Sequence, residues 1–222
     1  MKIKNFSLKK NRTQALNLLR ATVEVLNDVG IRYYLDFGTL LGAVREGELI
    51  PWDDDIDISL LDEDDYYKIP MVLKKIKKTY MLRTYLFTFK KSRERRVSRG
   101  RTIHTPHIWF THEDNYQIAK IRNNKFFIFG RGGATLDIFF KYTHGDETFW
   151  LAYGKTNKMP NQVMPKELIE IDFCGIKCTI PKNYEEYLTV KYGDWKTPNP
   201  DWCHDRDDLS AIYKQKEQNC LE

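Results

Sequence analysis

The sequence predicts a single α+β domain in which helices flank a mixed β-sheet. Three observations indicate this fold class. Residues 11–29 place apolar side chains at steps of three and four, which is the spacing of one helix face. Residues 80–142 contain several apolar or alternating runs, which are typical of strands. The last third offers both a hairpin and a short helix, so helices and strands are mixed in one domain.

The first element expected before residue 80 is a helix over 11–29. It should end there because Gly30 follows its last apolar residue. Pro70 should kink or reset the last of these elements, since proline lacks the N–H that a helix interior needs. In order, the elements are a helix over 11–29, a strand over 31–37 broken at Gly38-Thr39, a short helix over 40–47, a strand over 55–60 and a helix over 63–78.

After residue 80 the pattern favours strands until a hairpin and a helix close the series. Asn183 can begin that helix and Gly193 follows its end. The expected strands cover 80–89, 102–112, 116–122, 125–130 and 134–140, followed by a hairpin over 168–180 and a helix over 183–193.

Composition argues against a membrane-spanning or a secreted protein. Charged residues make up 30% of the 222 residues, and no apolar run reaches the roughly 18 residues of a membrane span. The basic start is not followed by the apolar segment of a signal peptide. We therefore expect no transmembrane segment and a cytoplasmic location. The net charge of +5 is mild and only weakly favours anionic partners.

The four cysteines are expected to be reduced thiols, the default without a secretory signal. Cys174 and Cys178 lie four residues apart in an expected tight turn. A zinc site would need two further ligands, for which Cys203 and His204 are the alternative candidates.

The segment "LIPWDDDIDISL" (49–60) places four aspartates on an apolar, β-branched strand. Side chains alternate along a strand, so Asp53, Asp55 and Asp57 share one face if the strand extends back that far. Carboxylates at this spacing repel one another and raise one another's pKa values, and burial adds to the cost. Oxygen-only ligands of this kind suit Mg²⁺ or Mn²⁺. A solvated acidic turn is the alternative, but it explains the alternation with isoleucine poorly.

Gly38-Thr39 precedes the acidic strand at an expected break between a strand and a helix. Such a break exposes N–H groups at a helix N-terminus, where phosphate binds. A phosphate site followed by a carboxylate strand is the layout of a nucleotidyltransferase-type site, although Gly-Thr alone is more often only a turn. Asp137 in "ATLDIFF" offers the further carboxylate that such sites use, with pairing to Arg131 or another base as the alternative.

Long sequence blocks resemble those of a known family. "GTLLGAVR" (38–45) and "IPWDDDID" (50–57) resemble two blocks of the LicD family, which includes the fukutin-type proteins. "LDIFF" (136–140) is similar to the family's later strand aspartate. "IPKNYEEYLTVKYGDWKTP" (180–198) is similar to its C-terminal segment. The resemblance runs from about residue 31 to 200 with a poorly matching middle.

The resemblance implies a nucleotidyltransferase-like fold over 1–222, with a metal and donor core at 31–142 and a C-terminal elaboration at 143–222. It implies a phosphotransferase that moves a phosphocholine or polyol-phosphate group from a CDP-activated alcohol donor to a sugar hydroxyl of a glycan or glycolipid. No nucleic acid partner is expected. Fukutin-type members carry a membrane anchor and a stem, neither of which this sequence shows, so a free-standing enzyme is expected.

The resemblance also implies roles for individual residues. Gly38 and Thr39 would contact donor phosphate, and Arg45 would anchor the helix or touch phosphate. In the mechanism that we derive from these roles, a carboxylate takes the proton of the attacking hydroxyl, with Asp137 as the first candidate and Asp36, one strand away, as the second. The expected ligands of Mg²⁺ or Mn²⁺ are Asp53, Asp55, Asp57 and Asp137, and the expected catalytic residues are Asp55, Asp57 and Asp137.

Two other functions stay open. A nucleotidyltransferase would add NMP to a small molecule and release pyrophosphate from an NTP. A catalytically inactive module would keep the fold and bind a nucleotide or a glycan. The acidic set argues against such a module, because a fold without activity has no reason to keep repelling charges together.

Two polar segments in the middle of the chain have weaker interpretations. The segment 89–101 carries seven basic residues and one acid, and it is expected to be a solvated loop. Contact with donor phosphate or an anionic acceptor is the alternative, and nucleic acid is a third. His104, His107 and His112 show no metal-ligand spacing and are expected to be strand or loop residues.

Overall fold

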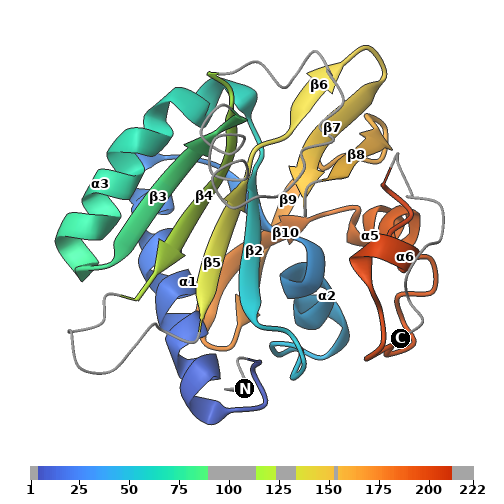
Figure 1. The fold of residues 1–222 in the computed structure, drawn as a ribbon, viewed down its shortest axis with the longest axis horizontal. Helices are drawn as coiled ribbons and strands as arrows, with labels where there is room; N and C mark the ends of the chain where they lie inside the picture. Colours follow the sequence, from blue (N-terminus) through green and yellow to red (C-terminus); the bar gives the residue numbers. More distant parts are fainter. Residues whose placement is uncertain (1–4, 90–113, 124–133, 153–154, 212–222) are drawn as a thin grey trace, which may run out of the picture.

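The structure, a computed structural model, describes residues 5–89, 114–123, 134–152 and 155–211. Its centre is a five-stranded sheet in the order β1-β2-β5-β4-β3, in which β2 and β5 run parallel and the other neighbours antiparallel. Helices flank this sheet, which confirms the predicted fold class (Figure 1). The strands are β1 (Tyr33–Leu35), β2 (Asp55–Leu60), β3 (Arg83–Thr88), β4 (Tyr116–Arg122) and β5 (Thr135–Phe139).

Alternation along β2 and β5 separates an apolar face of the sheet from an acidic one. The apolar side chains pack against α1 (Lys9–Val29), which itself packs against α3 (Ile69–Tyr80). The aspartates of both strands occupy the other face. The side chains buried on the apolar face, each with no exposed surface, are Ile56, Ile58, Leu136 and Ile138.

The helix predicted over 11–29 is confirmed as α1. Its stripe includes Leu18, Leu19 and Leu26, which are completely buried. Gly30 adopts a left-handed conformation with φ 74°, and its N–H donates to the carbonyl of Asn27. This is the geometry in which glycine ends a helix with the least strain.

The next helix, α2 (Phe37–Arg45), begins three residues earlier than the sequence predicts. The cause is Asp36, whose carboxylate accepts the Phe37 N–H at 2.7 Å and so caps the helix. Gly38 and Thr39 therefore lie inside the first turn of α2 rather than between a strand and a helix.

Pro70 resets the helix predicted over 63–78, as expected. A 3₁₀ helix, η1 (Glu63–Lys68), comes first, and Pro70 then lies in the first turn of α3. Proline is tolerated there because the first N–H groups of a helix have no partner within it.

The C-terminal third contains both predicted elements and a sheet that the sequence did not indicate. The hairpin and the helix are confirmed, and β10 packs beside β1 of the main sheet. The expected strands over 102–112 and 125–130 lie outside the described residues. The elements are β6 (Tyr142–His144), β7 (Glu147–Ala152), β8 (Lys155–Pro160), β9 (Leu168–Phe173), β10 (Ile176–Pro181), α5 (Tyr184–Tyr192) and α6 (His204–Asp207).

None of the helices in the described ranges is both long and apolar enough to cross a bilayer.

Candidate active site

The parallel pairing of β2 with β5 brings the acidic residues together. Asp57 lies directly opposite Asp137, and Asp55 lies one pleat away opposite Thr135. Asp55, Asp57 and Asp137 each place a carboxylate oxygen within 4.8 Å of the other two. Two strands that are distant in the sequence thus form one acid cluster.

Asp53 joins this cluster from outside the strand. β2 begins at Asp55, so the condition that the strand extends back to Asp53 is not met. Asp53 lies instead in the turn before β2, where it forms a second group of carboxylates with Asp54 and Asp55. Because Asp55 belongs to both groups, the four predicted ligands Asp53, Asp55, Asp57 and Asp137 belong to one continuous acid cluster.

Burial makes this concentration of charge unfavourable without a cation. Desolvation raises the pKa of Asp55 and Asp57 well above the usual range, and repulsion from the neighbouring carboxylates adds to the shift. Desolvation also raises the pKa of Asp137, against the opposing effect of Lys120. For Asp53, burial raises the pKa to about 6.

A divalent cation fits this donor set. Asp137 pairs with the Lys120 ammonium through Oδ2. Its other oxygen, Oδ1, is buried and has no hydrogen-bond partner among the described residues. A buried carboxylate oxygen is rarely left without a partner, and carboxylate oxygens are the ligands that Mg²⁺ and Mn²⁺ prefer.

Gly38 and Thr39 hold the aspartates in place from the first turn of α2. A Cβ atom added to Gly38 would lie well inside van der Waals contact with the Asp53 carboxylate, so only glycine leaves room for this approach. The Thr39 hydroxyl accepts the Asp57 N–H at 2.9 Å. The two residues thus contact the acids directly, and their expected contact with phosphate remains a prediction.

Asp36, the second candidate base, is enclosed beneath α2. Its carboxylate has no exposed surface. Besides capping α2, it accepts hydrogen bonds from Ser59 Oγ (2.6 Å), Lys141 Nζ (2.6 Å) and Tyr187 OH (2.7 Å). A carboxylate whose oxygens accept this many hydrogen bonds is fixed in position and is poorly placed to take a proton from a substrate.

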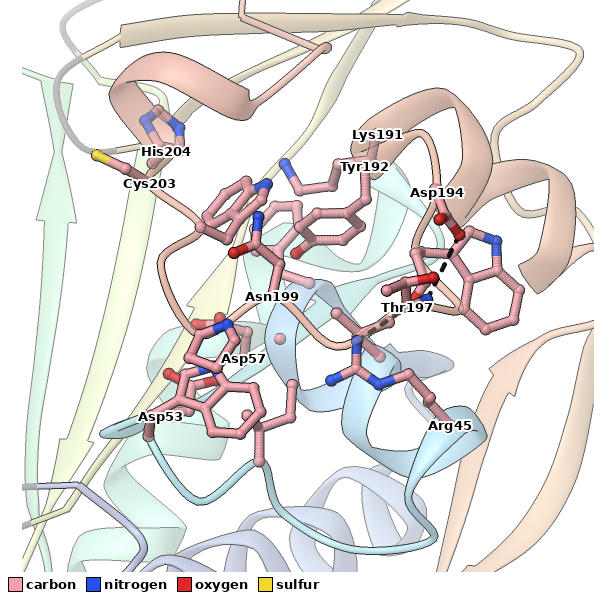
Figure 2. A pocket seen from close by; sticks show the side chains of 18 of the residues that line it. Arg45, Asp53, Asp57, Lys191, Tyr192, Asp194, Thr197, Asn199, Cys203 and His204 are labelled. Atoms are coloured by element: carbon pink, nitrogen blue, oxygen red, sulfur yellow. Dashed lines mark hydrogen bonds between the residues drawn. The ribbon is translucent and has the colours of Figure 1, made fainter.

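A cavity of about 670 Å³ opens beside the acid cluster (Figure 2). Asp53 and Asp57 lie together at one end, and Arg45 lies at the other. Arg45 donates to the Trp195 carbonyl at 3.1 Å and pairs with Glu46, which ties α2 to the C-terminal segment. These contacts do not involve phosphate, so the expected contact of Arg45 with phosphate stays a prediction.

The C-terminal segment forms the other wall of the cavity. Lys191 is buried there, with its ammonium 2.9 Å from Asp208 Oδ2 and 4.3 Å from the centre of the Phe37 ring. The sequence blocks match part of this wall, 180–198, to the family's C-terminal segment, but they give it no role in the site, because its polar and aromatic residues follow no spacing that marks one. The wall residues include Lys191, Tyr192, Asp194, Trp195, Thr197, Asn199, Trp202 and His204.

The alternative zinc site receives no support from the described residues. Cys174, Cys178 and Cys203 are free thiols, and the described groups able to hold a metal contain aspartates alone. Arg131, Cys220, the basic residues of 90–101 and the three histidines between 104 and 112 lie outside the described residues. The observed base beside Asp137 is Lys120, one of the open alternatives.

Comparison with known proteins agrees with this architecture. The family model for the LicD/FKTN/FKRP nucleotidyltransferase domain matches residues 30–183. Ribitol 5-phosphate transferase FKRP of Mus musculus is 27% identical over 183 residues, which are 82% of this chain and 32% of that protein. Lipopolysaccharide cholinephosphotransferase LicD of Haemophilus influenzae is 36% identical over 66 residues, which are 30% of this chain and 24% of that protein.

Among solved structures, the lincomycin-bound lincosamide antibiotic adenylyltransferase LnuA aligns with a TM-score of 0.41 and 14% identity, covering 78% of this chain and 83% of that one. The aligned region spans only about a third of the length of FKRP. The family match covers well over half of this chain. The chain therefore belongs to the LicD family and has its nucleotidyltransferase-like fold, as the sequence blocks predicted.

Proposed function

We propose that this protein is a metal-dependent phosphotransferase. It would move a phospho-alcohol group, such as phosphocholine or a polyol phosphate, from a CDP-activated donor to a sugar hydroxyl of a glycan or glycolipid. The observation that carries the proposal is the meeting of Asp55, Asp57 and Asp137, with Asp137 Oδ1 unpartnered among the described residues, beside a 670 Å³ cavity. Relatives named for ribitol 5-phosphate and for phosphocholine support the class of reaction, but they leave the transferred group open.

Asp53, Asp55, Asp57 and Asp137 would hold Mg²⁺ or Mn²⁺. When bound, such ions would offset the charge on the donor diphosphate and on the leaving CMP. The acceptor oxygen would form a new bond to phosphorus as the bond from phosphorus to CMP breaks. The proton of the acceptor hydroxyl would pass to a carboxylate. The Asp36 oxygens already accept several hydrogen bonds, whereas Asp137 Oδ1 has no partner among the described residues, so Asp137 is the candidate.

The cavity would hold the two substrates next to the acid cluster. Its aromatic side chains give a base or a sugar ring a surface to stack on, and its charged and amide groups offer hydrogen bonds. The N-terminus of α2 faces the same space through Gly38, so its N–H groups would favour donor phosphate there.

The test is a donor screen that measures CMP release. The protein is incubated with CDP-choline, CDP-ribitol or CDP-glycerol, Mg²⁺ and a glycan acceptor. We expect CMP release with one donor and its loss in Asp55→Ala and Asp57→Ala. Asp28→Ala, which removes an exposed aspartate of α1, serves as the matched control and should keep full activity.

Three results would contradict the proposal. CMP release that persists undiminished in both cluster variants would show that these acids are not needed for the transfer. Pyrophosphate release from an NTP and a small molecule, without CMP release from any CDP-alcohol, would instead indicate a nucleotidyltransferase. Binding of a nucleotide or glycan without any turnover would indicate an inactive module.

A further inference from the structure

Lys120 occupies a place in the acid cluster that no function described so far explains. It lies on β4 directly opposite Asp137 on β5, and its ammonium pairs with Asp137 Oδ2. Its neighbours in the strand, Ala119 and Ile121, are fully buried, so Lys120 points to the acidic face of the sheet. The Lys120 side chain keeps 26% of its surface exposed, against 5% for Asp137.

The two oxygens of Asp137 differ in their surroundings. Oδ2 is neutralised by the Lys120 ammonium, whereas Oδ1 is buried without a hydrogen-bond partner among the described residues. One carboxylate thus holds a cation of the protein on one side and keeps the other side available for an ion. Within the described residues, Lys120 is the one basic side chain that forms an ion pair with a member of the acid cluster, and that member is Asp137.

We propose that Lys120 is an internal counter-ion of the acid cluster that also binds the diphosphate of the nucleotide donor. In the free protein it rests on Asp137. When a divalent cation and the donor enter, it turns from Asp137 to a phosphate oxygen. This inference rests on the proposed function, because it assumes that the acids bind a cation together with a diphosphate.

The chemistry of lysine fits a movable contact of this kind. The ammonium is a compact charge on a flexible four-carbon stem, so it can exchange one anionic oxygen for another nearby without backbone movement. The partial exposure of the side chain leaves it room to do so. A charge-assisted hydrogen bond to phosphate would replace the one lost to Asp137.

Arg122 adds a second base on the same face. It follows Lys120 by two residues and lies opposite Thr135, one pleat along β5 from Asp137. Its charge lowers the pKa of Asp137, and its buried Nε has no hydrogen-bond partner among the described residues. The face therefore passes from acids on β2 to bases on β4, with Asp137 between them. A diphosphate that carries a divalent cation complements both sides, whereas an uncharged sugar complements neither.

A counter-ion and a merely structural ion pair predict opposite results when the charge is removed. If Lys120 competes with the cation for Asp137, Lys120→Met should bind the cation alone more tightly. If Lys120 only holds Asp137 in position, the same change should misplace Asp137 and lower the affinity for the cation. Diphosphate binding should fall only if the ammonium reaches phosphate.

The experiment measures two affinities by calorimetry on the full chain: Mn²⁺ alone, and CDP in saturating Mn²⁺. In Lys120→Met we expect Mn²⁺ to bind about fivefold more tightly and CDP about tenfold more weakly than in the wild type. Lys120→Arg keeps the charge and should hold CDP affinity within about threefold. Lys182→Met removes an exposed lysine that pairs with Glu167 next to the open end of the β9–β10 hairpin, and it should change neither affinity.

The outcomes separate this inference from the proposed function. Unchanged affinities in Lys120→Met, or weaker Mn²⁺ binding with unchanged CDP binding, would overturn the role of Lys120 alone. A wild-type protein that binds neither Mn²⁺ nor CDP would overturn the proposed function and this inference with it. If Lys120→Met does not fold, Lys120→Gln, which keeps a hydrogen-bond donor for Asp137, is measured in its place with the same criteria.

Discussion

Two buried acidic sites lie close together in this protein, and they are built in opposite ways. Asp36 is a single carboxylate that receives hydrogen bonds from a backbone N–H, two hydroxyls and the Lys141 ammonium. Asp57 and Asp137 are nearly as deeply buried, but they belong to a cluster in which acids face acids. The comparison teaches that burial of a carboxylate does not by itself mark a functional site. The number of donors around it distinguishes the two cases, because a buried charge without partners is costly.

The two sites also differ in what they connect. Asp36 joins the start of α2 to Ser59 of β2, to Lys141 after β5 and to Tyr187 of α5. It therefore ties the main sheet to the C-terminal part of the chain. The acid cluster contributes one such tie, the ion pair of Asp137 with Lys120, and repulsion between its members opposes folding. We expect substitutions in the first site to change stability and substitutions in the second to change activity.

The largest expected effect is on activity in the acid cluster. Asp57→Asn should lower the rate of transfer by roughly 10³-fold, the loss expected when a cation ligand that stabilises transition-state charge is removed. The free energy of unfolding in metal-free buffer should not fall, because a repulsive charge disappears. Steady-state CMP release and urea unfolding are the two measurements. A variant that keeps its rate but unfolds easily would place Asp57 with the structural carboxylates.

The matching change in the other site should act on stability. Lys141→Met leaves Asp36 buried without its ammonium and should lower the free energy of unfolding by about 3–5 kcal/mol. Urea unfolding in metal-free buffer measures this change. The affinity for Mn²⁺, measured by calorimetry on the folded variant, should stay within about twofold of the wild type. A large loss of Mn²⁺ affinity would show that the two sites are not separate.

The pH dependence of stability should reveal the unfavourable charges directly. Burial raises the pKa of Asp53 from 3.8 to about 6, so the folded chain holds more protons than the unfolded chain between these values. The stability that Asp53 contributes is complete below pH 3.8 and is lost as the pH rises through about 6. Relative to Asp53→Asn, the metal-free wild type should therefore lose stability between pH 4 and 6.5.

Mg²⁺ should restore that loss, so it should raise the melting temperature more at pH 7.5 than at pH 5. Thermal unfolding of both proteins with and without Mg²⁺ gives the four curves required. Equal shifts at the two pH values would contradict a cation held by these carboxylates.

A smaller effect is expected where α2 touches the acids. Gly38→Ala places a methyl group against the Asp53 carboxylate and should lower transfer activity by about tenfold, because that carboxylate must move. Stability should change by less than about 1 kcal/mol, since alanine is the better helix former. Gly30→Ala offers a control at a glycine with open space around it, which should keep activity even though its positive φ costs stability.

The smallest effect concerns the hydroxyl that supports Asp57. Thr39→Val removes the acceptor of the Asp57 N–H and should cost about 1 kcal/mol of stability. Activity should fall by less than in Gly38→Ala, because the Asp57 carboxylate itself is untouched. Chemical denaturation and the CMP assay, run side by side, give both numbers.

Much of the fold can be read from the sequence wherever periodicity is strong. Alternation of aspartate with isoleucine predicts β2, and the run around Asp137 predicts β5. The sheet of β6, β7 and β8 is not predicted, because segments such as "KTNKMP" lack an alternation of apolar residues. The start of α2 is also mispredicted, since the capping carboxylate of Asp36 reads as part of the preceding strand.

The residues of the candidate site are likewise predictable only in part. The sequence names the acids, because charges inside an apolar strand are conspicuous. It cannot name Lys120, whose position opposite Asp137 depends on the register between β4 and β5. Nor can it foresee that Arg45 reaches the carbonyl of Trp195 in a distant part of the chain. Such contacts arise from long-range pairing, which local periodicity does not encode.

The parallel pairing of β2 with β5 also determines when the acid cluster can form during synthesis. A nascent chain carries Asp55 and Asp57 long before Asp137 leaves the ribosome, and until then the first two acids are free to stay hydrated. Bringing together strands so distant in sequence costs entropy that only the finished sheet offsets. We therefore expect the chain to gain its affinity for a cation late in folding and in one step. A truncated chain that stops before β5 would possess most of the ligands and none of the affinity.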